Sequence, residues 1–113
     1  MYHLYLMEAP GGRTGFGICQ HYFDRNKKYI SHMGEIVKFS YIYGGTRAHA
    51  KSVERTIKQK LQDKLWTIED WKTEWLDDLS IDELKIYVDD LIERQHYKLE
   101  LVKTNYDITQ GKS

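Results

Sequence analysis

The stretch Thr14–Tyr29, TGFGICQHYFDRNKKY, decides how the rest of the chain is interpreted. Its first residues have the character of a β-strand but include glycines at positions 15 and 17. Glycine inside a strand usually marks a bulge or the close approach of a backbone or a ligand. The basic segment that follows predicts a helix over His21–His32, which carries Arg25 and ends at Gly34. The stretch therefore predicts a strand that leads directly into a helix.

The residues before this stretch predict its partner strand. Residues 2–7, YHLYLM, alternate so that Leu4 and Leu6 face one side of a strand while Tyr5 faces the other. Glu8–Gly12 then contains the only proline, followed by two glycines, which is a turn signal. We therefore expect an antiparallel hairpin with a loop of about five residues.

The segment after the first helix predicts a strand followed by a longer helix. Ile36–Tyr43, IVKFSYIY, is rich in β-branched and aromatic residues. Thr46 is placed to cap a helix that we expect to run to about Leu65. Apolar residues recur along this helix at spacings of three and four, and Glu54 lies at the edge of their stripe.

The C-terminal half predicts a third helix and a last strand. We expect residues 65–76, which hold all three tryptophans, to be irregular or partly extended. Ser80–Glu83 has the pattern of a capping box and opens a helix to about Gln95. Residues 97–103 alternate as a strand. The fold class expected is α/β (α+β): a three-stranded antiparallel sheet flanked by helices, with an added C-terminal helix and strand.

Length and composition are consistent with one small domain. The 113 residues are enough for a single core, which we place in residues 1–103, with a flexible tail over 104–113. No apolar run is long enough to span a membrane, and the N-terminus does not have the pattern of a signal peptide. The single cysteine, Cys19, excludes an internal disulfide and fits a reducing compartment. A cytoplasmic location, away from membranes, is the expectation.

The net charge of zero hides an uneven distribution. Residues 1–64 hold 11 basic and 5 acidic residues, whereas residues 65–95 hold 3 basic and 10 acidic residues. A basic half of this kind can bind a polyanion while the acidic half stays in solvent. Alternatively, the two halves neutralise each other within the fold.

The order of these elements and residues resembles that of the GIY-YIG nuclease family. The first strand of that family ends in a tyrosine, as in His3-Leu4-Tyr5, and the second ends in a glycine, as in Gly15-Phe16-Gly17. An arginine lies eight residues later on the first helix, at Arg25. A later helix carries a glutamate four residues after an alanine, as in Ala50–Glu54, and Glu74-Trp75-Leu76 is similar to a segment found in some branches.

The resemblance implies a metal-dependent endonuclease that hydrolyses DNA. Glu54 would hold Mg²⁺, or Mn²⁺ in its place, and the ion would act as a Lewis acid on the scissile phosphate. Arg25 would bind the non-bridging phosphate oxygens. Tyr5 would orient or deprotonate the attacking water, and a role as base requires nearby positive charge to lower its pKa. His32 is a candidate proton shuttle because histidine titrates near neutrality, and Tyr29 is a competing candidate.

The resemblance also indicates the partners of the protein. Duplex or branched DNA is the expected substrate, with a homodimer or a partner protein as a source of site selection, since the chain has no room for a separate recognition domain. A bacteriophage or mobile-element origin would suit such a small stand-alone domain. Basic side chains are available to follow a phosphate backbone without reading sequence: Lys27, Lys28, Arg47, Lys51 and Lys58.

Three alternatives stay open from the sequence. Glu54 could form only a surface ion pair with Lys58 one helical turn away, a contact worth about 0.3–0.5 kcal/mol. The position of the second family tyrosine holds Gly15, which favours a nuclease fold retained as a module that binds nucleic acid or a partner protein. The acidic segment 69–93 could also be a surface for protein interaction.

Overall fold

An antiparallel sheet of six strands forms the centre of the molecule, with the strand order β4-β5-β2-β1-β3-β6. The computed structural model describes residues 1–68 and 71–109, and the side chains of all of these except 66–68 and 71–73. The strands are β1 (Tyr2–Glu8), β2 (Thr14–Cys19), β3 (Lys38–Gly45), β4 (Leu65–Ile68), β5 (Trp71–Leu76) and β6 (Leu99–Tyr106). The helices are α1 (Tyr22–Met33), α2 (Arg47–Lys60) and α3 (Ile81–Gln95).

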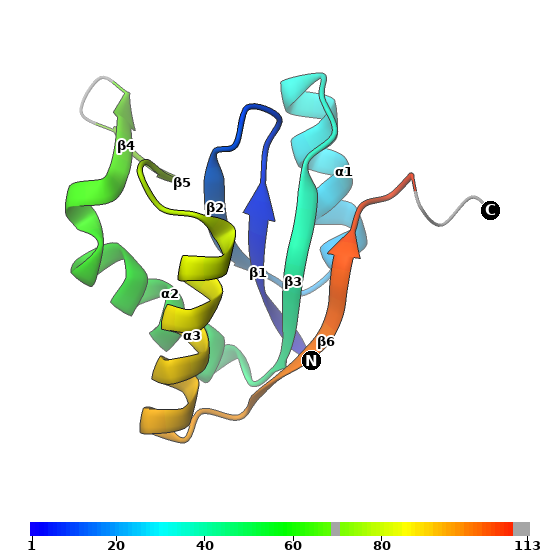
Figure 1. Ribbon diagram of the computed structural model, residues 1–113. Helices are drawn as coiled ribbons and strands as arrows, with labels where there is room; N and C mark the ends of the chain where they lie inside the picture. Colours follow the sequence, from blue (N-terminus) through cyan, green and yellow to red (C-terminus); the bar gives the residue numbers. More distant parts are fainter. Residues whose placement is uncertain (69–70, 110–113) are drawn as a thin grey trace.

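Helices cover both faces of this sheet (Figure 1). On one face, α2 and α3 pack over Leu4, Leu6 and Phe16, and this apolar cluster is the larger core. On the other face, α1 packs over a smaller cluster that contains Tyr5 and Phe39. The alternation expected for residues 2–7 is therefore confirmed, because the leucines and Tyr5 enter opposite cores.

Local signals in the sequence correctly identify the end of α1 and the starts of α2 and α3. Gly34 ends α1 in the left-handed conformation, with φ of 68°. Thr46 caps α2 by accepting a hydrogen bond from the backbone of His49. Ser80 and Glu83 form both hydrogen bonds of the capping box at the start of α3. The hairpin loop between β1 and β2, the added helix α3 and the added strand β6 are confirmed as well.

The sheet is wider than expected, and the prediction of three strands is wrong. Residues 65–68 and 71–76 form the paired strands β4 and β5, so the segment is extended and not irregular. The helix expected to reach Leu65 ends at Lys60, and a short 3₁₀ turn over Gln62–Lys64 leads into β4. Strand β6 continues to Tyr106 beside Phe39, so a tail that begins at residue 104 is placed too early, and residues 110–113 lie outside the described range.

Two other expectations concern segments that the structure describes only in part. The side chains of Trp66 and Trp71 lie outside the described side chains, whereas Trp75 packs against the cluster beneath α1. Residues 69–70 of the acidic segment also lie outside the described range. Of the helices in the described ranges, none is both long and apolar enough to cross a membrane.

Candidate functional site

Tyr5 and Gly17 lie side by side at the centre of the sheet. They are direct neighbours in the antiparallel register of β1 and β2. The Tyr5 ring lies over Gly17, so that a Cβ atom at position 17 would be 2.2 Å from the Tyr5 hydroxyl oxygen. The ring also stacks on Phe39 with centroids 4.3 Å apart. The glycine in the β2 strand is therefore required by the close approach of a side chain from β1.

Helix α1 brings two polar side chains onto the Tyr5 hydroxyl. Arg25 and Tyr29 lie four residues apart and hence on the same side of the helix. An Arg25 Nη1 group donates a hydrogen bond to the Tyr5 hydroxyl at 3.3 Å, and the hydroxyls of Tyr5 and Tyr29 lie 2.9 Å apart. The tyrosine of the first strand and the arginine of the first helix, both predicted as site residues, are thus in contact.

Glu74 completes this group, and the sequence did not reveal its role. The Tyr29 hydroxyl donates a hydrogen bond to the Glu74 carboxylate, across 45 residues of sequence. Glu74 reaches this position because β5 pairs with β2, with Gly15 opposite Trp75. The signal was the Glu74-Trp75-Leu76 segment, but a segment expected to be irregular or partly extended, with no partner strand assigned, gives no reason to place its glutamate beside α1.

The tyrosine pair is held in its neutral form. Burial, followed by the nearby charge of Glu74, raises the pKa of Tyr5 well above its usual value, although Tyr29 and Arg25 act in the opposite direction. The pKa of Tyr29 is also raised, mainly by burial and then by Tyr5 and Glu74. The positive charge that was expected to lower the pKa of Tyr5 is present, but it is outweighed. A free phenolate at either position is therefore not the resting state.

Glu54 approaches the same group from the opposite face of the sheet. It is half-buried on α2, and burial raises its pKa above the usual value. Lys58 lowers this pKa, Glu74 raises it, and Lys51 and Arg25 lower it further. The charges of Glu54, Glu74 and Arg25 are thus close enough to interact. The interaction with Lys58 is also present, but it is one of several.

The arrangement of the strands explains how groups from two faces can meet. The described pairing of β5 with β2 covers only Thr14 and Gly15. Gly17 and its neighbours toward the C-terminal end of β2 lie beyond this pairing, and α2 contacts β2 from the other face of the sheet. Side chains from α1 and α2 can therefore approach each other around this edge.

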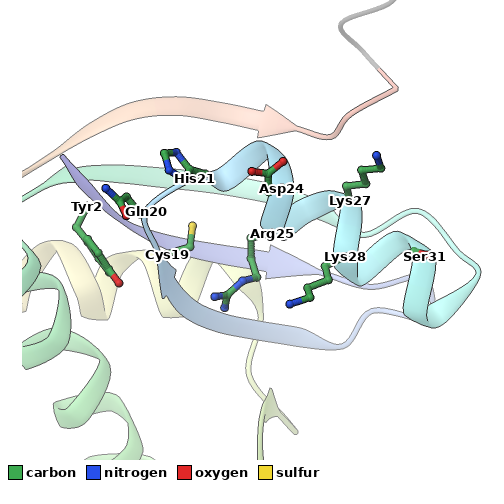
Figure 2. A pocket seen from close by; sticks show the side chains of 9 residues that line it. All are labelled: Tyr2, Cys19, Gln20, His21, Asp24, Arg25, Lys27, Lys28 and Ser31. Atoms are coloured by element: carbon green, nitrogen blue, oxygen red, sulfur yellow. The ribbon is translucent and has the colours of Figure 1, made fainter.

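Two hollows run along α1, and both are lined by Arg25 and Lys28. The first has a volume of about 520 Å³ and is also lined by Lys27 and Tyr2. The second has a volume of about 500 Å³. Figure 2 shows the first hollow, with Arg25 and Lys28 extending from α1 to one side while Asp24 and Lys27 point the other way.

The other basic residues predicted to bind nucleic acid surround the same region. The Arg47 guanidinium lies 5.6 Å from the ring centre of Tyr2, which lines the first hollow. Lys51 and Lys58 act electrostatically on Glu54. The structure therefore places all of the predicted basic residues near either the hollows or Glu54.

The structure separates the two candidates for the proton shuttle. Tyr29 and His32 both line the second hollow. Tyr29 is half-buried and bonded to both Tyr5 and Glu74, whereas His32 is exposed in the last turn of α1. Of the two, Tyr29 therefore has the better-defined connection to the group.

Gly15, the counterpart of the second family tyrosine, lies in a filled space. A Cβ atom there would be 2.7 Å from both Met7 Cε and Trp75 Cε3. These two side chains occupy the region that a larger residue at position 15 would need. A tyrosine at this position is therefore incompatible with the packing of β5 against β2.

Comparisons of the chain with models of protein families, with curated proteins and with solved structures each found no match. The family resemblance therefore stays a prediction that depends on the residues and the geometry. Within the described ranges, no group of three or more His, Cys, Asp and Glu side chains is placed to hold a metal ion.

Proposed function

We propose that this protein is a metal-dependent endonuclease that hydrolyses phosphodiester bonds in DNA, as its resemblance to GIY-YIG nucleases implies. One observation carries the proposal. The Tyr5 hydroxyl, packed on Gly17, is bonded to Arg25, and the charge of Arg25 also acts on Glu54 from another helix. These three residues, separated by up to 49 positions in the sequence, supply the groups that the proposed hydrolysis would use: a cation for phosphate, a carboxylate for metal and a phenol bonded to the cation.

The donor chemistry at Glu54 fits Mg²⁺. The ion prefers oxygen ligands and commonly keeps several waters, so that one or two carboxylates are sufficient. Glu54 is half-buried, and burial together with the charge of Glu74 disfavours its ionised form. A nearby divalent cation would offset this cost. When bound, Mg²⁺ would neutralise charge on the phosphate and on the leaving oxygen.

Arg25 would bind the phosphate. Its guanidinium carries five N–H donors in a planar fork, so the bond to Tyr5 leaves donors for the non-bridging oxygens. Arg25 also lines both hollows, where the backbone of a DNA strand could lie. Lys27 and Lys28 lie on the same helix. These groups recognise the backbone and not the bases, which is consistent with a substrate chosen by its structure or by a partner.

Tyr5 would act by holding other groups in place. Its side chain is fully buried, and Arg25, which does line the hollows, contacts its hydroxyl. Direct contact between Tyr5 and the attacking water, as the resemblance implies, would require Arg25 to move. In the observed geometry Tyr5 instead fixes Arg25 and Tyr29 with respect to each other.

The test is cleavage of supercoiled plasmid by the wild-type protein and by Glu54→Ala, with Mg²⁺ and with EDTA. We expect nicking or linearisation that requires Mg²⁺ and that Glu54→Ala reduces by at least about 100-fold, the scale expected for loss of an essential electrostatic group. Glu93→Ala, an exposed glutamate of α3, is the control and should cleave as the wild type does. Equal cleavage by Glu54→Ala would show that the site is assigned wrongly.

The alternative is a nuclease fold that binds nucleic acid or a partner protein without cleavage. The full burial of Tyr5 and the filled space at Gly15 favour it. A gel-shift assay on duplex and branched DNA separates the two functions. Binding that is weakened by Lys28→Ala, without cleavage of any of these substrates in Mg²⁺ or Mn²⁺, would support the binding module and contradict the nuclease.

A further inference from the structure

The hydrogen bonds among Arg25, Tyr5, Tyr29 and Glu74 have one direction. Each tyrosine hydroxyl has a single hydrogen to donate. Tyr29 gives its hydrogen to the Glu74 carboxylate, which only accepts when ionised. The Tyr5 hydroxyl must therefore donate to Tyr29, while it accepts from Arg25. The chain of donors thus ends at Glu74.

The position of Tyr29 in this chain differs from that of Tyr5. Tyr5 is fully buried, whereas Tyr29 is half-buried and lines the second hollow together with Arg25 and Lys28. Arg25 and Lys28 are the cations on which a phosphate in this hollow would be held. Tyr29 is therefore the phenol that a water molecule attacking such a phosphate can reach, and its hydroxyl is already bonded to a carboxylate.

We propose that Glu74 is the proton acceptor of this site and that it receives, through Tyr29, the proton that the attacking water loses. This inference depends on the proposed nuclease function. As the water oxygen bonds to phosphorus, its proton passes to the Tyr29 oxygen, and the Tyr29 proton passes to the Glu74 carboxylate. The bond between phosphorus and the leaving oxygen breaks, and the leaving oxygen takes a proton from solvent. Glu74 then returns its proton to solvent.

The environment of Tyr29 favours a relay over a standing phenolate. Because its pKa is raised by burial, Tyr5 and Glu74, Tyr29 stays protonated and can accept a proton only while it gives one away. Among described residues, the charged and titratable groups that act on Glu74 or Tyr29 or share their hollow are Tyr5, Arg25, Glu54, Lys28 and His32. Of the cations in this group, Arg25 donates its hydrogen bond to Tyr5.

The experiment measures single-turnover cleavage by Glu74→Gln at saturating Mg²⁺. Glutamine keeps the size and an oxygen acceptor for Tyr29 but cannot take its proton. We expect cleavage to slow by roughly 100-fold, as for loss of a general base. Glu93→Gln on α3 makes the same chemical change on an exposed side chain and should have no effect. Glu74→Asp, which keeps a carboxylate, should recover part of the rate.

A solvent isotope measurement separates proton transfer from positioning. In mixtures of H₂O and D₂O the wild-type rate should depend on deuterium fraction along a curve, because two protons move together. Glu74→Gln should straighten this curve and reduce the isotope effect, since the second transfer is removed. A slower Glu74→Gln with an unchanged isotope effect would overturn the relay, because the carboxylate would then only hold Tyr29 in place.

The remaining outcomes are also decisive. Cleavage by Glu74→Gln within about threefold of the wild-type rate would overturn the relay while the proposed nuclease function stands. An inactive wild-type protein would overturn both proposals. If Glu74→Gln melts below the assay temperature, the Tyr29→Phe variant tests the relay in its place. The relay predicts that Tyr29→Phe cleaves roughly 100-fold more slowly than the wild type. Full activity of Tyr29→Phe would overturn the relay.

Discussion

The two faces of the sheet are built from different kinds of side chain. Beneath α2 and α3, the core is formed by aliphatic residues with Phe16 and with Tyr43, whose hydroxyl donates a hydrogen bond to Asp89. Beneath α1, the core contains hydroxyl, amide and thiol groups, including Tyr5, Asn26 and Cys19. Among described residues, each fully buried side-chain polar atom has a hydrogen-bond partner. One face is therefore mainly an apolar core, while the interior of the other includes several hydrogen-bonded polar side chains.

The largest effect that tests this comparison is expected on the apolar face. Leu84 of α3 is fully buried, and Leu84→Ala should lower the free energy of unfolding by about 2–5 kcal/mol. Ile86, two residues along the same helix, is 69% exposed, and Ile86→Ala should change stability by less than about 0.5 kcal/mol. Urea denaturation of both variants measures the difference. Similar losses for the two would contradict the assignment of the stabilising core to this face.

A smaller effect is expected for the polar groups beneath α1. Asn26 is fully buried, donates to the carbonyl of Val37 at 2.8 Å and accepts from the backbone N–H of Ile108 at 3.0 Å. Asn26→Ala removes both bonds and should cost about 1–3 kcal/mol, because the partners lose their hydrogen bonds. Lys27→Ala, at the adjacent exposed position, is the control for helix propensity. A loss of unfolding free energy no greater than that of the control would show that Asn26 does not hold the segment that follows β6 against α1.

The smallest expected change concerns reactivity and leaves the fold intact. Burial raises the pKa of the Cys19 thiol to about 11, and Arg25 only partly opposes this. The thiolate should therefore be rare at pH 8, and alkylation of the folded protein should become roughly tenfold faster with each pH unit up to that pKa. Protein unfolded in urea, whose thiol titrates near its usual pKa of about 8.5, is the control. A labelling rate that levels off near pH 9 in the folded state would contradict the burial of this thiol.

The parts of the fold that were predicted correctly depend on local signals. The Gly34 end of α1, the Thr46 cap of α2 and the capping box at Ser80 each involve residues a few positions apart. Such signals act within one helical turn, so a short stretch of sequence is sufficient to read them. The opposite orientation of Tyr5 and the neighbouring leucines likewise follows from the two-residue repeat of a strand.

Most of the incorrect predictions concern pairing between strands, and the end of α2 at Lys60 is an exception. Strands β4 and β5 are short, and residues 65–76 lack a clear alternation, so a partner was needed to identify them. The extension of β6 to Tyr106 is fixed by pairing with β3 and not by the polar residues at its end. Glu74 was missed for the same reason, since its place beside Tyr29 follows from the register of β5 against β2.

The sequence by itself determined the α+β class, the hairpin, the end of α1 and the starts of α2 and α3, while the candidates Tyr5, Arg25 and Glu54 came from the resemblance to a known family. The class, the hairpin and these helix ends depend on residue type, spacing or periodicity, which are properties of a linear chain. Only the tertiary structure decided that Tyr5 is buried, that Tyr29 and not His32 is bonded to it, and that Glu74 ends the hydrogen-bond chain. Burial and hydrogen bonding depend on which segments pack together, and residues 45 positions apart carry no local signal of their contact.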